Sequence, residues 1–173
     1  MTQKQPKYRI LCVCKGNTCR TPMIEAFLKR EFRKTGKFYA FIEVKSAGIH
    51  PEAKTGSSAN KHSIKEMADR GIDISDHKST RVDDVQDLDQ FDSILFVGKE
   101  ELDMFTKHIN DNYSESDAFA ISLGTKMWIV NGDKGGIPNP YKKGPEAYAE
   151  CAETIEKAMV EIAQKILSPW RNT

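Results

Sequence analysis

The side chains best suited to chemistry stand together near the start of the chain. The run Cys14-Lys15-Gly16-Asn17-Thr18-Cys19-Arg20-Thr21 places thiols, a permanent cation and hydroxyl groups close together. A thiolate can attack phosphorus, and the planar guanidinium of Arg20 can hold two phosphate oxygens at once, which a lysine could not match. We therefore predict that Cys14 captures a phosphoryl group, with Arg20 as the phosphate clamp and the Thr21 hydroxyl as a hydrogen-bond donor to the sulfur.

This chemistry needs a backbone that folds into a cup. Gly16 permits backbone angles that other residues resist, and Asn17 tolerates left-handed geometry and can hydrogen-bond locally. In a loop between a strand and a helix, N–H groups can turn inward, and the positive end of the helix dipole adds to their field. That field, together with Arg20, would keep Cys14 as a thiolate at neutral pH.

A cysteine and an arginine with five residues between them are a weak signal on their own. A buried cysteine and a helix arginine often meet this spacing by chance, and core packing is then the alternative interpretation. The functional interpretation rests on the whole order, which is an apolar strand followed by Cys14, Gly16, Asn17, Arg20, Thr21, Pro22 and Glu25.

Alternating strands and helices are expected around this loop. The apolar run at 8–13 reads as a buried strand that leads into the loop, and Pro22 stands where a first helical turn tolerates proline. Strands alternating with helices imply a mostly parallel sheet, and such sheets bind ligands beyond the carboxyl ends of their strands, where the Cys14 loop lies. We expect further strands at 41–44, 93–97 and 118–123, and helices at about 22–33, 58–70, 99–108 and 145–167.

Composition points to one globular domain. A chain of 173 residues with 39% apolar side chains can build one core, which we expect at 8–168, between an N-terminal arm at 1–7 and a frayed tail at 169–173. The 26 lysines and arginines nearly balance the 25 aspartates and glutamates, so no global field draws the chain to nucleic acid or to a membrane. The opening residues are polar and no apolar run reaches spanning length, so we expect no signal peptide, no anchor and a cytoplasmic location.

The four cysteines suggest thiol chemistry rather than a secreted disulfide scaffold, because three of them crowd one short segment. Cys12 and Cys14 are separated by one residue, and no Cys-x-x-Cys or His pair stands nearby, so we expect no metal site. Cys19 is close enough around a curled loop to form a disulfide with Cys14 once peroxide has converted the nucleophile to sulfenic acid. The alternative for Cys19 is a small buried residue that faces the helix.

The stretch Val13-Cys14-Lys15-Gly16-Asn17-Thr18-Cys19-Arg20-Thr21-Pro22-Met23 resembles the signature of the low-molecular-weight protein tyrosine phosphatases. Further stretches at 45–48, 70–73, 75–77 and 91–92 fall at family-like places, so the resemblance runs through most of the chain. It implies a single three-layer α/β domain with a four-stranded parallel sheet flanked by helices, the phosphatase loop after the first strand, and no metal or other cofactor.

The resemblance also implies roles for individual residues. Cys14 would be the nucleophile, Arg20 the transition-state clamp and Thr21 the hydrogen-bond donor to the thiolate. The network that holds the loop would join Asn17, Ser46 and His77. The phosphate-binding loop would comprise Cys14, Lys15, Gly16, Asn17, Thr18, Cys19 and Arg20.

The chain departs from the family pattern in a second loop, where the family carries an aspartate before Pro-Tyr that protonates the leaving oxygen and later activates water. Here Ile137-Pro138-Asn139-Pro140-Tyr141 keeps the loop but has an amide at position 139. An amide cannot exchange a proton near neutral pH, and loss of a general acid or base typically costs about 10²–10⁴-fold in rate. A further departure is Val97-Gly98, where the family usually has methionine and aspartate.

Three interpretations of Asn139 stay open. The chain is an enzyme that uses another acid such as Asp133 or Glu146, it carries a substitution made to trap a phosphocysteine intermediate, or it is a pseudoenzyme that recognises phosphate. We favour phosphatase identity, because Cys14 and Arg20 are both present and a pure binding module would not need the thiol.

The leading hypothesis is a phosphomonoester hydrolase that acts on phosphotyrosine in proteins, is inhibited by inorganic phosphate or vanadate, and is a monomer or weak dimer. Thr18 raises phosphoarginine as an alternative, because related protein arginine phosphatases resemble this chain in having threonine where tyrosine-specific members often carry a bulky aliphatic residue. Tyr141 could stack beside an aromatic substrate at the wall of the pocket, and Lys15 could attract an acidic substrate at its rim. The rival from another class is a noncatalytic protein that binds phosphoresidues.

Overall fold

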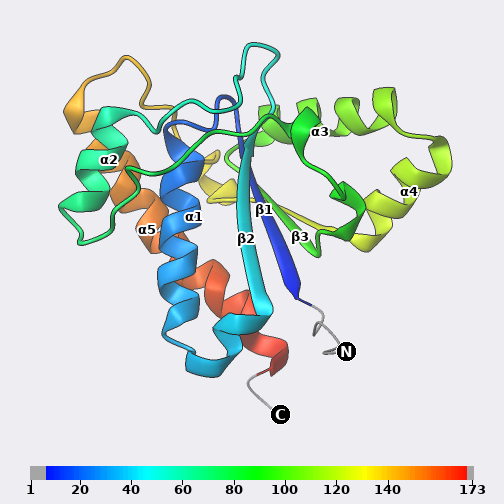
Figure 1. The fold of residues 1–173 in the computed structure, drawn as a ribbon, viewed down its shortest axis with the longest axis horizontal. Helices are drawn as coiled ribbons and strands as arrows, with labels where there is room; N and C mark the ends of the chain where they lie inside the picture. The colour runs from blue at the N-terminus through cyan, green and yellow to red at the C-terminus, as the bar shows by residue number, and fades with distance from the viewer. Residues whose placement is uncertain (1–6, 171–173) are drawn as a thin grey trace.

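The computed structural model describes residues 7–170, apart from the side chains of residues 37 and 38. Its four strands form one parallel sheet in the order β2-β1-β3-β4, as expected for strands that alternate with helices (Figure 1). The strands are β1 (Tyr8–Cys14), β2 (Ile42–Gly48), β3 (Ser93–Phe96) and β4 (Lys126–Ile129). The helices are α1 (Arg20–Arg33), α2 (Lys61–Ala68), α3 (Lys99–Asn112), α4 (Glu115–Gly124) and α5 (Pro145–Leu167).

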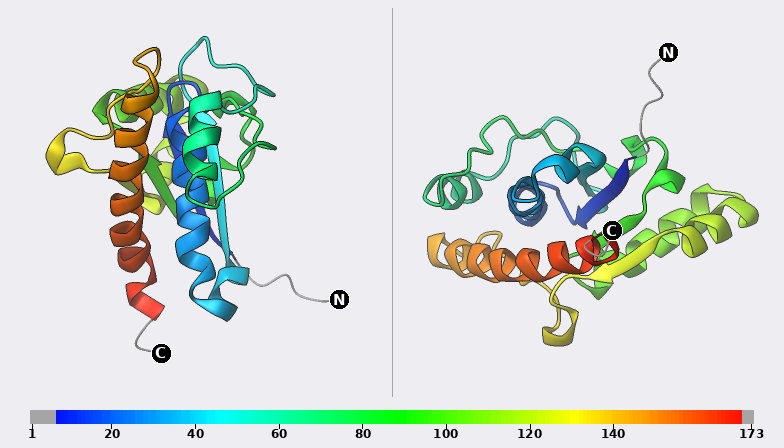
Figure 2. Two further views of the ribbon diagram at one scale, coloured as in Figure 1. Left: turned by 90° about the vertical axis from the view of Figure 1, so that its left-hand side faces the viewer. Right: turned by 90° about the horizontal axis from the view of Figure 1, so that it is seen from below.

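The sheet is buried on both faces, which explains why β1 reads as a continuous apolar run. Ile10, Cys12 and Cys14 of β1 belong to a core that also contains the apolar faces of α1 and α5. Leu11 and Val13 point to the opposite core, which is closed by α3 and α4. Figure 2 shows α1 and α5 side by side on their face of the sheet, so the molecule has three layers.

The prediction of a strand at 118–123 is wrong. These residues lie in helix α4, and the fourth strand, β4, begins only after that helix. Ser114 caps α4, since its side chain accepts a hydrogen bond from the Asp117 N–H, and acidic residues fill the first turn. Ala118 and Ile121 are buried three residues apart on one helix face, whereas Phe119 and Leu123 are exposed. The buried positions in α4 therefore have helical spacing, but the helix is too short for this spacing to be recognised in the sequence.

The ends of the elements differ from expectation in smaller ways. Helix α2 begins later than expected because Asn60 caps it, its side chain accepting a hydrogen bond from the His62 N–H. Helix α3 runs past residue 108 to Asn112. No helix among residues 7–170 is long and apolar enough to cross a membrane.

Residues 169 and 170, which were expected in a frayed tail, are part of a turn instead. Ser168–Trp170 forms a 3₁₀ turn, and the Trp170 ring meets the Tyr8 ring edge-on with their centroids 5.3 Å apart. Residues 171–173 and residues 1–6 of the expected N-terminal arm lie outside the described residues.

Candidate active site

The Cys14 sulfur lies where two hydrogen bonds converge. Strand β1 ends at Cys14 and helix α1 begins at Arg20, so the intervening loop curls at the carboxyl end of the sheet. The Asn17 N–H donates to Cys14 Sγ at 3.2 Å, and Thr21 Oγ1 lies 3.0 Å from the same sulfur. The Thr21 oxygen already accepts from Asn17 Nδ2 at 2.9 Å, which leaves its hydrogen to point at the sulfur. Two donors from the loop and the first turn of α1 therefore meet at this sulfur.

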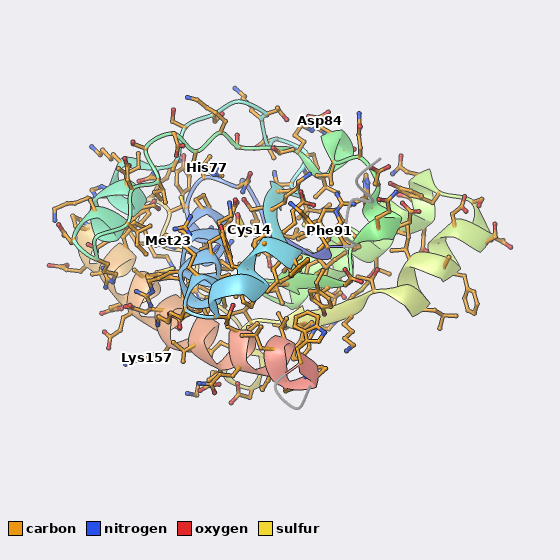
Figure 3. The ribbon with its side chains drawn as sticks, turned by 60° about the horizontal axis from the view of Figure 1, so that its bottom comes forward. Cys14, Met23, His77, Asp84, Phe91 and Lys157 are labelled. Carbon is orange, nitrogen blue, oxygen red and sulfur yellow. The ribbon has the colours of Figure 1, made fainter. Side chains whose placement is uncertain are left out.

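Cys14 itself is only 2% exposed. Figure 3 shows it near the middle of the molecule, between Met23 of α1 and Phe91. Met23 shares the core of Cys14, and Phe91 belongs to the core on the other side of the sheet. The sulfur is therefore held by close-packed surroundings, which limit the directions from which a ligand can approach it.

Asn17 is the centre of the network that shapes the loop. It is fully buried and has a left-handed backbone, with a φ of 56°. Besides Thr21, its Nδ2 donates to Ser46 Oγ at 2.8 Å, and its Oδ1 accepts from the Thr80 N–H at 2.8 Å. Its carbonyl oxygen lies 2.9 Å from His77 Nε2. The structure thus brings Asn17, Ser46 and His77 together, as the resemblance implies.

Two members of this network carried no role in the sequence interpretation. Glu25 accepts a hydrogen bond from Ser46 Oγ at 2.5 Å and pairs with Lys29 one turn further along α1. Thr80 contributes only its main-chain N–H, a group that every residue except proline has, so its side-chain type gives no signal. Glu25 could have been assigned to the network from the sequence, because it is the last residue of the ordered series that begins with Cys14.

Gly16 does not supply the unusual backbone angles that were expected of it. It has no left-handed backbone, which falls to Asn17 instead. The glycine that a close approach requires is Gly48 at the end of β2, since a Cβ there would lie 2.9 Å from both the Gly16 carbonyl carbon and the Lys15 carbonyl oxygen. The end of β2 therefore packs directly against the backbone of the loop at residues 15 and 16.

Arg20 is held by acceptors from two other segments. It is 5% exposed, and its Nη1 donates to the Ile137 carbonyl at 2.9 Å. Its Nη2 donates to Glu101 Oε1 at 3.2 Å, and Glu101 is itself 3% exposed. No acceptor in residues 7–170 lies within hydrogen-bond reach of Arg20 Nε, which leaves one edge of the guanidinium for a ligand.

The remaining loop side chains lie at the rim or against α5. Lys15 pairs with Glu100 at 2.9 Å and is partly exposed. Thr18 Oγ1 lies 3.8 Å from Cys19 Sγ, and Cys19 Sγ is 3.3 Å from the hydroxyl of Tyr148. Burial raises the pKa of the Cys19 thiol above its ordinary value. The four cysteines are all free thiols here, and the Cys14–Cys19 disulfide stays a prediction.

The loop with Asn139 borders the same site. Its Ile137 carbonyl is the one that holds Arg20, and the Cys151 thiol of α5 lies 3.8 Å from the Pro138 carbonyl. Asn139 is partly buried, and its Oδ1 accepts from the Tyr141 N–H at 3.2 Å, while the Tyr141 ring is exposed. This small turn fixes the position of the Asn139 amide.

Neither of the two replacement acids is buried near this loop. Asp133 and Glu146 are both exposed. Among residues 7–170 no group of three His, Cys, Asp or Glu side chains is arranged to hold a metal ion.

The chain matches the family described as low molecular weight phosphotyrosine protein phosphatase over residues 9–169. It is 29% identical to a protein-arginine-phosphatase of Geobacillus stearothermophilus over 92% of this chain and 96% of that protein. It is 26% identical to the low molecular weight protein-tyrosine-phosphatase Etp of Escherichia coli over 91% of this chain and 93% of that protein. A solved low molecular weight protein tyrosine phosphatase from T. tengcongensis aligns with a TM-score of 0.72 at 27% identity, covering 92% of this chain and 99% of that one.

Proposed function

Because the chain belongs to the low molecular weight phosphotyrosine protein phosphatase family, we propose that it hydrolyses phosphorylated proteins through a phosphocysteine formed on Cys14. The observation that carries this proposal is the pair of hydrogen bonds from the Asn17 N–H and the Thr21 hydroxyl onto one buried sulfur. A sulfur that serves only as core packing needs no such donors. Cys12 on the same strand is the contrast, because its sulfur is equally buried but receives no such hydrogen bond from residues 7–170.

The reaction proceeds in two displacements at phosphorus. The Cys14 thiolate attacks, an S–P bond forms, and the bond to the substrate oxygen breaks as that oxygen takes up a proton. The free Nε edge of Arg20 and the loop N–H groups hold the non-bridging oxygens while their charge develops. Water then attacks phosphorus and gives up a proton to the solvent, the S–P bond breaks, inorganic phosphate leaves, and the Thr21 hydroxyl stabilises the departing thiolate.

Asn139 affects the proton transfer that accompanies each step. Its amide cannot supply that proton, so phenyl esters with acidic leaving groups should turn over better than alkyl esters. Asn139→Asp should raise the turnover of alkyl esters by about 10²–10⁴-fold, and p-nitrophenyl phosphate should gain less. The side-chain Oδ1 of aspartate can accept the same Tyr141 N–H, so this substitution leaves the turn in place. An equal rate in both proteins would mean that another acid serves the reaction or that the chain has another role.

The test of the whole proposal is p-nitrophenyl phosphate hydrolysis by the wild type and by Cys14→Ser. Cys151→Ala is the matched control, because its thiol is buried beside the same site but makes no hydrogen bond to Cys14 or Arg20. We expect Cys14→Ser to abolish activity, the control to keep it, and vanadate or phosphate to inhibit. Tight binding of a phosphopeptide by the wild type without turnover would instead identify a protein that only recognises phosphoresidues.

Phosphotyrosine is the substrate that we place first, and phosphoarginine is the second candidate. Thr18 in the loop and the similarity to an arginine phosphatase favour the second. The two are separated by comparing kcat/KM on peptides that differ only in the phosphorylated residue. Thr18→Ile should shift the ratio toward phosphotyrosine if the loop side chain sets the preference. A cytoplasmic location and a monomeric or weakly dimeric state stay predictions.

A further inference from the structure

A buried carboxylate, that of Glu101, forms an ion pair with the guanidinium of Arg20. Glu101 lies in the first turn of α3, and its Oε1 accepts from Arg20 Nη2 at 3.2 Å. The Glu101 side chain is 4% exposed and that of Arg20 is 6% exposed, so solvent screens this ion pair little. Removing one partner of such a pair leaves a buried charge uncompensated.

The contacts of Arg20 decide which edge of its guanidinium is free. Ile137 takes a hydrogen bond from Nη1 and Glu101 takes one from Nη2, so protein acceptors hold both terminal nitrogens of the group. A guanidinium is planar, with five donors in a fixed fork. Holding both terminal nitrogens therefore fixes the plane of the group and the direction of its Nε–H, which stays available to a phosphate oxygen.

Gly98 makes room for this carboxylate. A Cβ at position 98 would lie 3.1 Å from Glu101 Oε2, which is closer than ordinary van der Waals contact. The φ of Gly98 is −173°, an extended value that any residue adopts, so what glycine provides there is space for the Glu101 carboxylate and not backbone freedom. Position 98 is the one where the family usually has aspartate.

We propose that Glu101 is the positioning residue for Arg20, and that the carboxylate usual at position 98 has moved one helical turn along α3, with Gly98 vacating its place. This inference rests on the proposed function. Glu101 touches no reacting atom, since it acts through the orientation of the Arg20 guanidinium.

A second effect of Glu101 has the opposite sign and makes the proposal testable. A negative charge beside Arg20 also repels an anion in the cup, so its removal would tighten anion binding if charge alone mattered. If orientation dominates, its removal weakens anion binding instead. Vanadate, which takes the trigonal bipyramidal shape of the transition state, should then lose more affinity than phosphate.

The experiment measures vanadate and phosphate dissociation constants by calorimetry, so it needs no turnover. We expect Glu101→Ala to weaken vanadate binding by about 10- to 100-fold, the usual effect of losing a hydrogen bond to a charged group. Glu101→Gln, which keeps the acceptor oxygen, should lose far less. Thermal denaturation of each variant checks that it is folded at the temperature of the titration.

A cycle with Gly98→Asp separates positioning from stability. In the wild-type background the new carboxylate competes for the space of Glu101 and should weaken vanadate binding, whereas in the Glu101→Ala background it should restore much of the lost affinity. Equal effects of Gly98→Asp in the two backgrounds, or unchanged or tighter vanadate binding by Glu101→Ala, would overturn the proposal. A wild-type protein that binds no vanadate would overturn the proposed function as well, so the two failures are distinguishable.

Discussion

Replacement of Asn17 by alanine tests whether the loop is held by its hydrogen bonds. The Asn17 side chain is fully buried and serves three partners, Thr21, Ser46 and the Thr80 N–H. Each bond contributes about 1 kcal/mol net, and an alanine at a left-handed φ costs about 1 kcal/mol more, so we expect Asn17→Ala to lower the free energy of unfolding by about 4 kcal/mol. That is a large share of the ~5–15 kcal/mol typical of a domain.

Asn17→Gly is the matched control, because it loses the same three bonds without the left-handed cost. We expect it to be about 1 kcal/mol more stable than Asn17→Ala. Urea denaturation of the three proteins measures both differences.

The same pair of variants tests the link from loop to sulfur. Without Asn17 Nδ2, the Thr21 hydroxyl is no longer oriented toward Cys14, so kcat for p-nitrophenyl phosphate should fall about 10-fold or more in both variants. A loss of less than 1 kcal/mol in Asn17→Ala, together with unchanged kcat, would show that the packing around the loop and not this network fixes its shape.

Three further predictions concern the thiols, the second loop and the core. Iodoacetamide at pH 7 should alkylate Cys14 well before Cys151, since burial raises the pKa of Cys151 to about 12 and leaves almost no thiolate there; peptide mass spectrometry reads the order, and equal rates would contradict it. Gly136→Ala should reduce activity and stability together, because Gly136 has a φ of 91° and a Cβ there would lie 2.4 Å from the Val97 carbonyl oxygen. Phe27→Ala should cost about 3–5 kcal/mol in urea denaturation, since the ring is fully buried beneath the sheet.

Much of this architecture was predictable because its signals are local. Each signal spans only a few residues: the apolar run of β1, the glycine and asparagine that follow it, and the proline at the start of α1. The fourth strand was predicted in the wrong place because the local sequence pattern there does not distinguish a strand from a short helix. Residues 118–123 are apolar except for Ser122, and the cap at Ser114 and the burial of Ala118 and Ile121 fit the helix that they form.

The predicted site was incomplete for a different reason. Asn17, Ser46 and His77 come together as the family resemblance implied, but Glu101 reaches Arg20 from a helix that follows another strand. Such a contact depends on where α3 packs, which no local pattern encodes. The glycine at position 98 was a visible sign, yet its meaning depended on the missing Cβ being next to a carboxylate.

The edge-on contact between Tyr8 and Trp170 has a practical consequence for experiments on single molecules. It joins the first strand to the turn after α5, and β1 rises about 3.3 Å per residue, so Cys14 lies about 20 Å from this contact at the other end of the strand. A dye or a surface tether attached beside either aromatic ring would therefore lie at the opposite end of β1 from the Cys14 sulfur. Pulling on both attachment points would load the two aromatic rings before the sheet, so the rings should separate first.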